Sequence, residues 1–180
     1  MLSLSPLLLD SAMLDEARVF LRIDQEYDDP SLEAILLAAI GHAEEFTGQV
    51  LIRRTVREIV PSAPQAQKLS AAPVVEIGPL SAIPADGTRF PIDPAQYTSS
   101  IERGGDGCIS LLRPGAAGRI EIQYTAGLSP SWGELPESLR LGILRLTGHL
   151  FAHRDDLSDP GPPAAVAALL RPWRRIRLFA

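Results

Sequence analysis

The chain lacks several features whose presence would assign it to a functional class. Cys108 is the one cysteine among 180 residues, which excludes an internal disulfide and any zinc site built from several cysteines. The apolar cluster at residues 7–9 is far shorter than a signal-peptide core or a membrane span. We therefore expect a protein that is made and kept in a cytoplasm, with no membrane segment and with Cys108 as a small residue in a strand.

The sequence also lacks the short motifs of common enzyme classes. No Gly-Lys-Ser/Thr phosphate loop, dinucleotide fingerprint or Gly-x-Ser-x-Gly elbow occurs in it. His149 and His153 are one helical turn apart and are the best metal candidates, but no glutamate follows His149 to complete a zinc-protease pattern. We expect no enzyme activity, no metal and no cofactor, and we keep a metal-dependent hydrolase using the two histidines as a minor hypothesis.

Positive charge is scarce except at the C-terminal end. The 17 Lys and Arg residues against 22 Asp and Glu give a net charge of -5, which argues against a general nucleic-acid binder. Four arginines lie within the last ten residues, so the rest of the chain carries 13 basic and 22 acidic residues, a net charge of -9. An acidic body and a basic tail predict two different surfaces.

Length and composition predict one folded domain over residues 1–180. Hydrophobic residues make up 46% of the chain and charged residues 22%, both near the globular average. Residues 11–48 favour two helices, the second with an apolar stripe at helical spacing and with Gly48 at its end. Residues 136–154 and 164–170 favour two more helices, the last of which ends at Pro172.

Helical spacing disappears between about residues 55 and 125. Short β-favouring runs at 55–60, 73–77, 108–112 and 119–125 alternate there with turn residues such as those at 86–87 and 104–107. We therefore predict an α+β fold that is mainly a bundle of about four helices. A small antiparallel sheet would be inserted over about residues 50–127, and an extended tail would follow at 171–180.

The third predicted helix is apolar on more than one face. Leu141, Leu144 and Phe151 lie away from its main apolar stripe. A helix of this kind must bury more than one face, either inside its own bundle or against another subunit. Both outcomes are compatible with an oligomer.

The C-terminal segment has the sharpest pattern in the sequence. It combines apolar anchors with arginines that can donate charge-assisted hydrogen bonds to acidic or phosphate groups. The segment consists of Leu170, Arg171, Pro172, Trp173, Arg174, Arg175, Ile176, Arg177, Leu178 and Phe179. We favour docking of this tail on a partner protein. Folding back onto its own domain and gripping nucleic acid are the two alternatives.

The order of these segments resembles the head-tail connector, or adaptor, family of long-tailed phages and gene transfer agents. The resemblance lies in Leu14-Asp15-Glu16-Ala17 and Phe20-Leu21-Arg22-Ile23-Asp24, in the helix ending at Glu45-Phe46-Thr47-Gly48, in residues 120–127, in Pro136-Glu137-Ser138-Leu139 and in residues 168–174. It covers nearly the whole chain. Two departures are Trp173, where tyrosine is common, and residues 150–154, where an aromatic pair and Asn-Arg are common.

The resemblance implies a structural role at the head-tail junction of a particle assembled in a bacterial cytoplasm. Such proteins form a ring beneath the portal, and we expect about twelve copies, with the tail-side stopper as the next partner. The C-terminal tail would reach the portal, and Leu141, Leu144 and Phe151 would supply ring contacts. Double-stranded DNA would pass through without specific binding. A DNA-binding module that uses the C-terminal arginines is the alternative.

Overall fold

The computed structural model describes residues 1–23, 29–113, 118–153 and 163–175. The chain divides into two compact units. The β unit comprises residues 1–6 and 52–128, and the helical unit comprises residues 7–51 and 129–180. About 39% of the structure is helical and 29% is strand, so the predicted α+β class is confirmed, whereas a mainly helical bundle is not.

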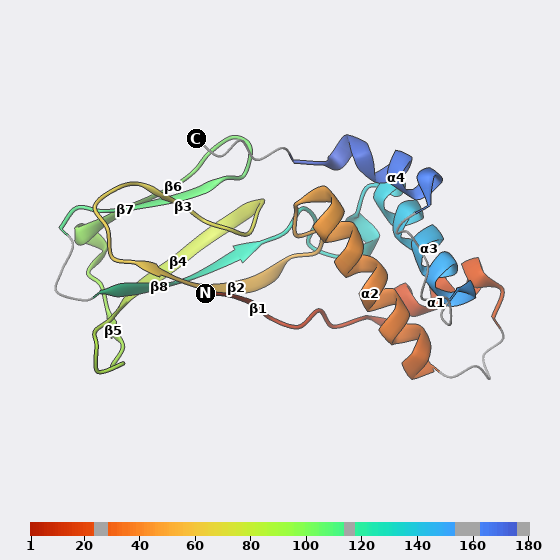
Figure 1. Ribbon diagram of the computed structural model, residues 1–180, viewed down its shortest axis with the longest axis horizontal. Coiled ribbons are helices and arrows are strands. Elements are labelled where there is room, and N and C mark those ends of the chain that lie inside the picture. The colour runs from red at the N-terminus through yellow and green to blue at the C-terminus, as the bar shows by residue number, and fades with distance from the viewer. Residues whose placement is uncertain (24–28, 114–117, 154–162, 176–180) are drawn as a thin grey trace. The chain divides into compact units, whose positions relative to one another are not determined.

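The helical unit contains four α-helices among its described residues (Figure 1). They are α1 (Ser11–Leu21), α2 (Asp29–Thr47), α3 (Glu137–Ala152) and α4 (Ala164–Leu170), with the 3-10 turns η2 (Trp132–Glu134) and η3 (Arg171–Trp173). The predicted helices are therefore present. Helix α1 begins one residue after Asp10, whose side chain accepts a hydrogen bond from the backbone N–H of Met13 at 2.8 Å, an N-cap that the sequence analysis missed.

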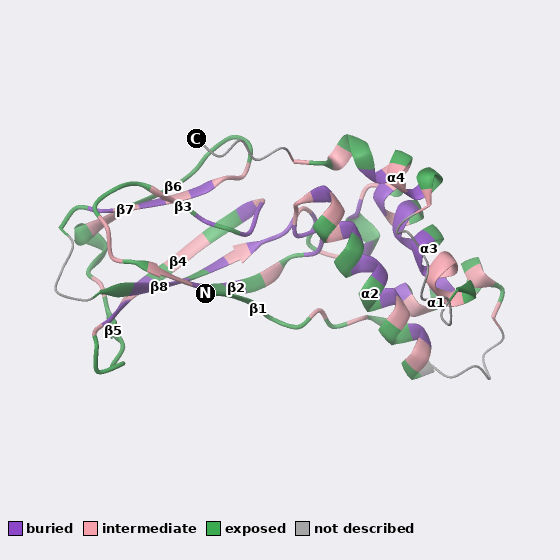
Figure 2. Cartoon of the chain, in the orientation of Figure 1, coloured by how far each residue is buried: buried purple, intermediate pink, exposed green. Residues whose placement is uncertain are grey.

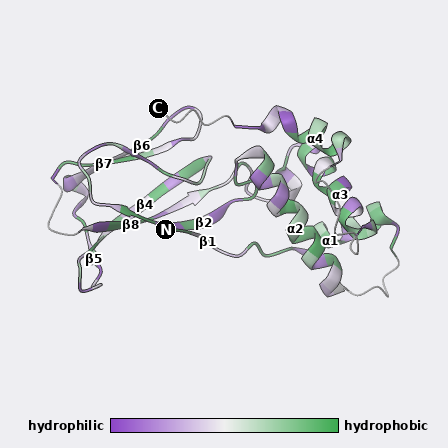
Figure 3. Cartoon of the chain, viewed as in Figure 1, coloured by the Kyte–Doolittle hydropathy of each residue, from purple (hydrophilic) through white to green (hydrophobic). Residues whose placement is uncertain are grey.

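The core of the helical unit is built from the apolar stripes of its helices. Figures 2 and 3 show buried and hydrophobic residues recurring along α2 and α3. Gly142 of α3 lets α4 approach closely, because a Cβ there would lie 2.9 Å from Leu170 Cδ2. The most deeply buried apolar residues are Met13, Ala17, Leu32, Leu36, Ala39, Ile40, Ala43, Leu51, Trp132, Leu139, Ile143, Leu146, Val166 and Leu170.

The β unit contains two antiparallel sheets in its described residues. The larger has the strand order β1-β2-β8-β4-β5, and the smaller has the order β3-β7-β6. The strands are β1 (Leu2–Leu4), β2 (Arg54–Pro61), β3 (Gln67–Lys68), β4 (Val74–Ile83), β5 (Phe90–Pro91), β6 (Tyr97–Ile101), β7 (Gly107–Leu111) and β8 (Arg119–Ala126). The four predicted β runs match β2, β4, β7 and β8.

A buried polar cluster joins β2, β8 and the segment before β4. Glu58 accepts hydrogen bonds from the Tyr124 hydroxyl at 2.7 Å and from the backbone N–H of Ser70 at 3.0 Å. The Tyr124 oxygen in turn accepts from the N–H of Ala71 at 3.0 Å. Because a buried carboxylate needs hydrogen-bond partners, these contacts explain how Glu58 is tolerated in the interior of the β unit.

Candidate functional site

The helical unit carries an apolar groove of about 490 Å³. Its lining residues come from α1, the start of α3 and the end of α4: Glu16, Val19, Phe20, Glu137, Ser138, Arg140, Leu141, Leu144 and Leu169. Val19 is 79% exposed, Phe20 41% and Leu141 36%. Large apolar side chains that line a hollow and remain exposed mark a surface suited to binding another macromolecule.

The groove exists because α1 and α3 each have a second apolar face. Helix α1 buries Met13 and Ala17; Val19 projects from a different part of its surface, and Phe20 lies on the same side as Met13 but at the C-terminal end of the helix, where it stays exposed. Helix α3 buries Leu139 and Ile143 fully, while Leu141 stays exposed. Leu141 and Leu144, two of the three predicted ring-contact residues, therefore meet in one groove. Phe151 is half-buried farther along α3 and does not line it.

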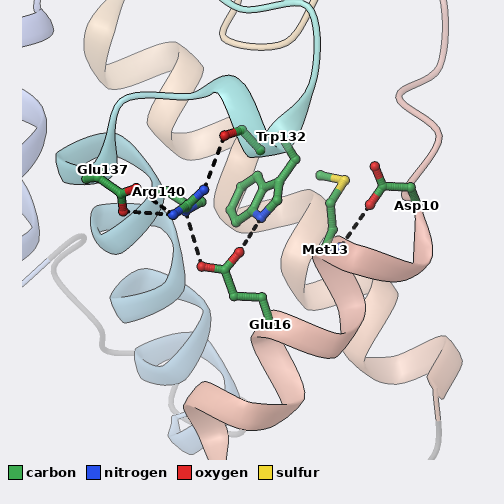
Figure 4. A network of polar contacts seen from close by, with 7 residues as sticks. Asp10, Met13, Glu16, Trp132, Glu137 and Arg140 are labelled. Carbon is green, nitrogen blue, oxygen red and sulfur yellow. Dashed lines mark hydrogen bonds and ion pairs between the residues drawn. The ribbon is translucent and has the colours of Figure 1, made fainter.

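A polar network lies at one rim of this groove (Figure 4). Glu16 of α1 accepts a hydrogen bond from the Trp132 indole N–H at 2.7 Å and forms an ion pair with Arg140 at 3.2 Å. Arg140 also donates to both carboxylate oxygens of Glu137, at 2.7 and 2.8 Å, and to the carbonyl of Gly133 at 3.4 Å. The network therefore joins α1 to α3 and to η2 at this rim of the groove.

The described part of the C-terminal segment packs on its own helical unit. Leu170 is fully buried, and the Trp173 indole N–H donates to the Ser138 hydroxyl at 2.9 Å. The Gln49 side-chain amide donates to the Trp173 carbonyl, and the backbone N–H of Arg175 donates to the Thr47 carbonyl at 2.8 Å. These contacts support the fold-back alternative for residues 170–175.

The outer surface of this segment remains basic. Arg171, Pro172 and Arg174 are exposed, and the Arg174 guanidinium lies 5.8 Å from the centre of the Phe46 ring. Trp173 and Arg175 are half-buried. Ile176, Arg177, Leu178 and Phe179, the rest of the predicted docking segment, lie outside the described residues.

Charge is distributed unequally between the two units. The sequence ranges of the helical unit hold 9 of the 17 basic residues and 15 of the 22 acidic residues, a net charge of -6. The β unit holds the other 8 basic and 7 acidic residues, a net charge of +1. The predicted acidic body is therefore essentially the helical unit alone.

His149 and His153 lie side by side on α3, with ring centroids 4.5 Å apart. Nδ1 of His153 is 3.0 Å from the carbonyl oxygen of His149. The described residues contain no cluster of three or more His, Cys, Asp or Glu side chains that could hold a metal. Nor does any helix in the described ranges have the length and apolar character needed to cross a membrane.

Comparison with known proteins links this chain to particle necks. Chains in structures described as "Neck of empty GTA particle computed with C6 symmetry" and "Virion of native gene transfer agent (GTA) particle" are each 28% identical to it, with TM-scores of 0.79 and 0.80. A chain of "Neck of native GTA particle computed with C12 symmetry" is 27% identical, with a TM-score of 0.78. Each alignment covers 99% of this chain and 97% of the other.

No family model and no curated protein sequence matches the chain. The structural similarities support a structural role in the neck of a gene transfer agent particle, and the symmetry of the two neck structures is consistent with a ring of identical subunits.

The sequence analysis predicted neither the polar network nor the groove. Glu16 and Trp132 are 116 positions apart, and no local pattern pairs a glutamate with a tryptophan at that separation. The (i, i+3) spacing of Glu137 and Arg140 was a usable signal for their ion pair.

Proposed function

We propose that this chain is a non-catalytic structural adaptor that forms a ring between the portal and the tail-side stopper, in the neck of a gene transfer agent or phage particle. The observation that carries this proposal is the similarity, over 99% of the chain, to chains of gene transfer agent neck and virion structures. The C12 symmetry of one of those necks favours twelve copies. Double-stranded DNA would pass through the ring without specific binding.

A closed ring needs a head-to-tail interface, in which two different patches of one subunit meet. The groove that contains Leu141 and Leu144 is one such patch, because it exposes apolar surface on a unit whose own core is already filled. Phe151, half-buried on the same helix, is the third residue proposed for this contact.

The C-terminal segment is proposed to dock on the portal. Because Leu170, Trp173 and Arg175 contact their own helical unit, we assign docking to the exposed Arg171, Pro172 and Arg174 and to residues 176–179. Leu170, Trp173 and Arg175 would then hold the start of the segment in a fixed place, which reduces the conformational entropy lost when the segment docks.

Electron microscopy of the full chain mixed with purified portal tests the ring. A ring stacked on the portal is the expected image. Portal particles that remain bare at saturating concentrations of a folded chain would refute the adaptor assignment.

Two truncations test the tail. Removal of residues 176–180 should abolish portal binding while it keeps the Trp173 and Arg175 contacts that hold the segment to the helical unit. Removal of residues 171–180 should also lower stability, because it deletes the Trp173 contacts. Undiminished portal binding by the shorter truncation would refute this assignment.

DNA binding by the exposed arginines is the second candidate, favoured by the outward position of Arg171 and Arg174. It requires an affinity for duplex DNA that falls steeply as salt rises. A chain that fails to retard DNA at low salt while it still binds the portal would remove this candidate.

A further inference from the structure

The groove on the helical unit is better suited to an apolar occupant than to a charged one. Arg140 is paired with both Glu16 and Glu137, and Glu16 is also bonded to Trp132. The charges at the rim are therefore largely satisfied within the unit, and what remains open is the apolar lining formed by Val19, Phe20, Leu141 and their neighbours. An occupant gains free energy there chiefly by burying apolar surface.

A second, separate apolar surface lies on the same unit. The outer face of α2 exposes Leu37, which is 39% accessible, together with Ala34, Ala38 and Gly41, and the exposed Glu33, His42 and Glu45 border this small apolar patch. None of these residues lines the groove. Figure 2 shows exposed positions repeating along this helix.

Small residues around Leu37 let another molecule approach the α2 backbone. Nothing lies within 4 Å of the point where a Gly41 Cβ would stand, so packing within one copy does not require glycine there. Glycine inside a helix is destabilising relative to alanine. A close contact with another copy would account for it.

We propose that the groove of one copy receives the outer face of α2 from the next copy, with Leu37 inserted beside Leu141. This inference rests on the proposed ring function and specifies its two contact surfaces. Two different patches on one unit are what a head-to-tail ring requires, whereas a two-fold dimer would use one patch twice. The similar chains occur in necks computed with C6 and C12 symmetry, which makes a second copy the occupant that we choose over the basic tail or an unrelated partner.

Cysteine cross-linking in assembled particles tests this contact. All variants carry Cys108→Ser, because Cys108 is the one native thiol. Leu37→Cys and Leu141→Cys are introduced singly and together, and particles from a producing strain are oxidised and analysed on non-reducing gels. Val75→Cys combined with Leu141→Cys is the matched control, because Val75 is 40% exposed, as Leu37 is at 39%, but belongs to the β unit.

The double variant should give a ladder of dimers and higher multimers, since each copy would link to the next one around the ring. Co-expressed single variants should give dimers and nothing larger. Disulfides form only when the two Cα atoms are within about 4–7 Å, so the Val75 control should give no ladder. If the double variant does not assemble, the dimer formed by the co-expressed single variants still tests the contact.

Two results would overturn the inference. One is particles that contain the variants but show no cross-linked species. The other is self-linking by Leu141→Cys alone, which would indicate a two-fold contact. Particles that lack even the wild-type chain would instead refute the proposed function, and the inference with it.

Discussion

Replacing Trp173 by alanine should destabilise the helical unit by about 2 kcal/mol. Truncation of a fully buried tryptophan to alanine lowers the free energy of unfolding by about 3–5 kcal/mol. Trp173 is half-buried, so about half of that loss is expected, including about 1 kcal/mol from the indole hydrogen bond to Ser138. Trp173→Phe keeps much of the apolar contact and should cost about 1 kcal/mol.

Urea unfolding followed by the circular dichroism of the helices measures this effect. With an m-value of about 2 kcal/mol per molar urea, a loss of 2 kcal/mol lowers the midpoint by about 1 M. Arg171→Ala is the control, because Arg171 is exposed and a surface change should stay within about 0.5 kcal/mol. If Trp173→Ala unfolds at the wild-type midpoint, the C-terminal segment is not anchored to the unit as described.

Three further predictions concern stability. Gly127→Ala should lower the free energy of unfolding by about 2–5 kcal/mol, because a Cβ would lie 2.4 Å from Arg53 Cα at a φ of +151°. Gly118→Ala is the control, because a Cβ there meets nothing within 4 Å. Equal denaturant midpoints for the two variants would contradict this prediction. Arg22→Gly should raise the free energy of unfolding by about 0.5–1 kcal/mol, because Arg22 caps α1 at a φ of 55°, a left-handed conformation that glycine adopts without steric cost. A lowered melting temperature would contradict this prediction. Arg140→Met should lower the free energy of unfolding by about 1–3 kcal/mol, because it removes the hydrogen bonds of Arg140 at the groove rim. Arg145→Met, at an exposed position, should leave stability nearly unchanged. A thermal scan that shows no difference between the two variants would refute the role assigned to the network.

The helices were predictable because their signals are local. In α2, apolar residues recur at helical spacing, and Gly48 follows with a φ of +66°, the conformation that ends many helices. The N-cap of α1 was also readable in principle, since Asp10 immediately precedes the first helical residue.

The extent of the sheet was harder to predict. Strand β6 has the sequence Tyr-Thr-Ser-Ser-Ile, four of whose five residues are exposed, so it carries no alternation of buried and exposed positions. Strands β1 and β3 are two or three residues long and are defined by pairing with distant segments, as Leu4 is with Val56, whereas the two-residue β5 pairs with β4 across the turn at 86–87. Pairing with distant segments depends on tertiary contacts that no local pattern encodes.

The position of the C-terminal segment shows why a sequence pattern for binding does not identify the partner. Tryptophan and arginine are frequent at interfaces because they combine apolar area with hydrogen-bond donors. The same properties serve equally well inside one chain, where Trp173 bonds Ser138 and Arg174 lies over Phe46.

The polar network lowers the desolvation cost of association between copies. If Glu16 and Arg140 were unpaired, each copy entering a ring would have to desolvate both charges at the groove rim. Because they pair with each other and with Trp132 and Glu137 inside one copy, association can be governed mainly by the fit of apolar surfaces. The association of this unit with a second copy should therefore depend only weakly on salt, whereas contacts made by the exposed Arg171 and Arg174 should weaken as salt rises.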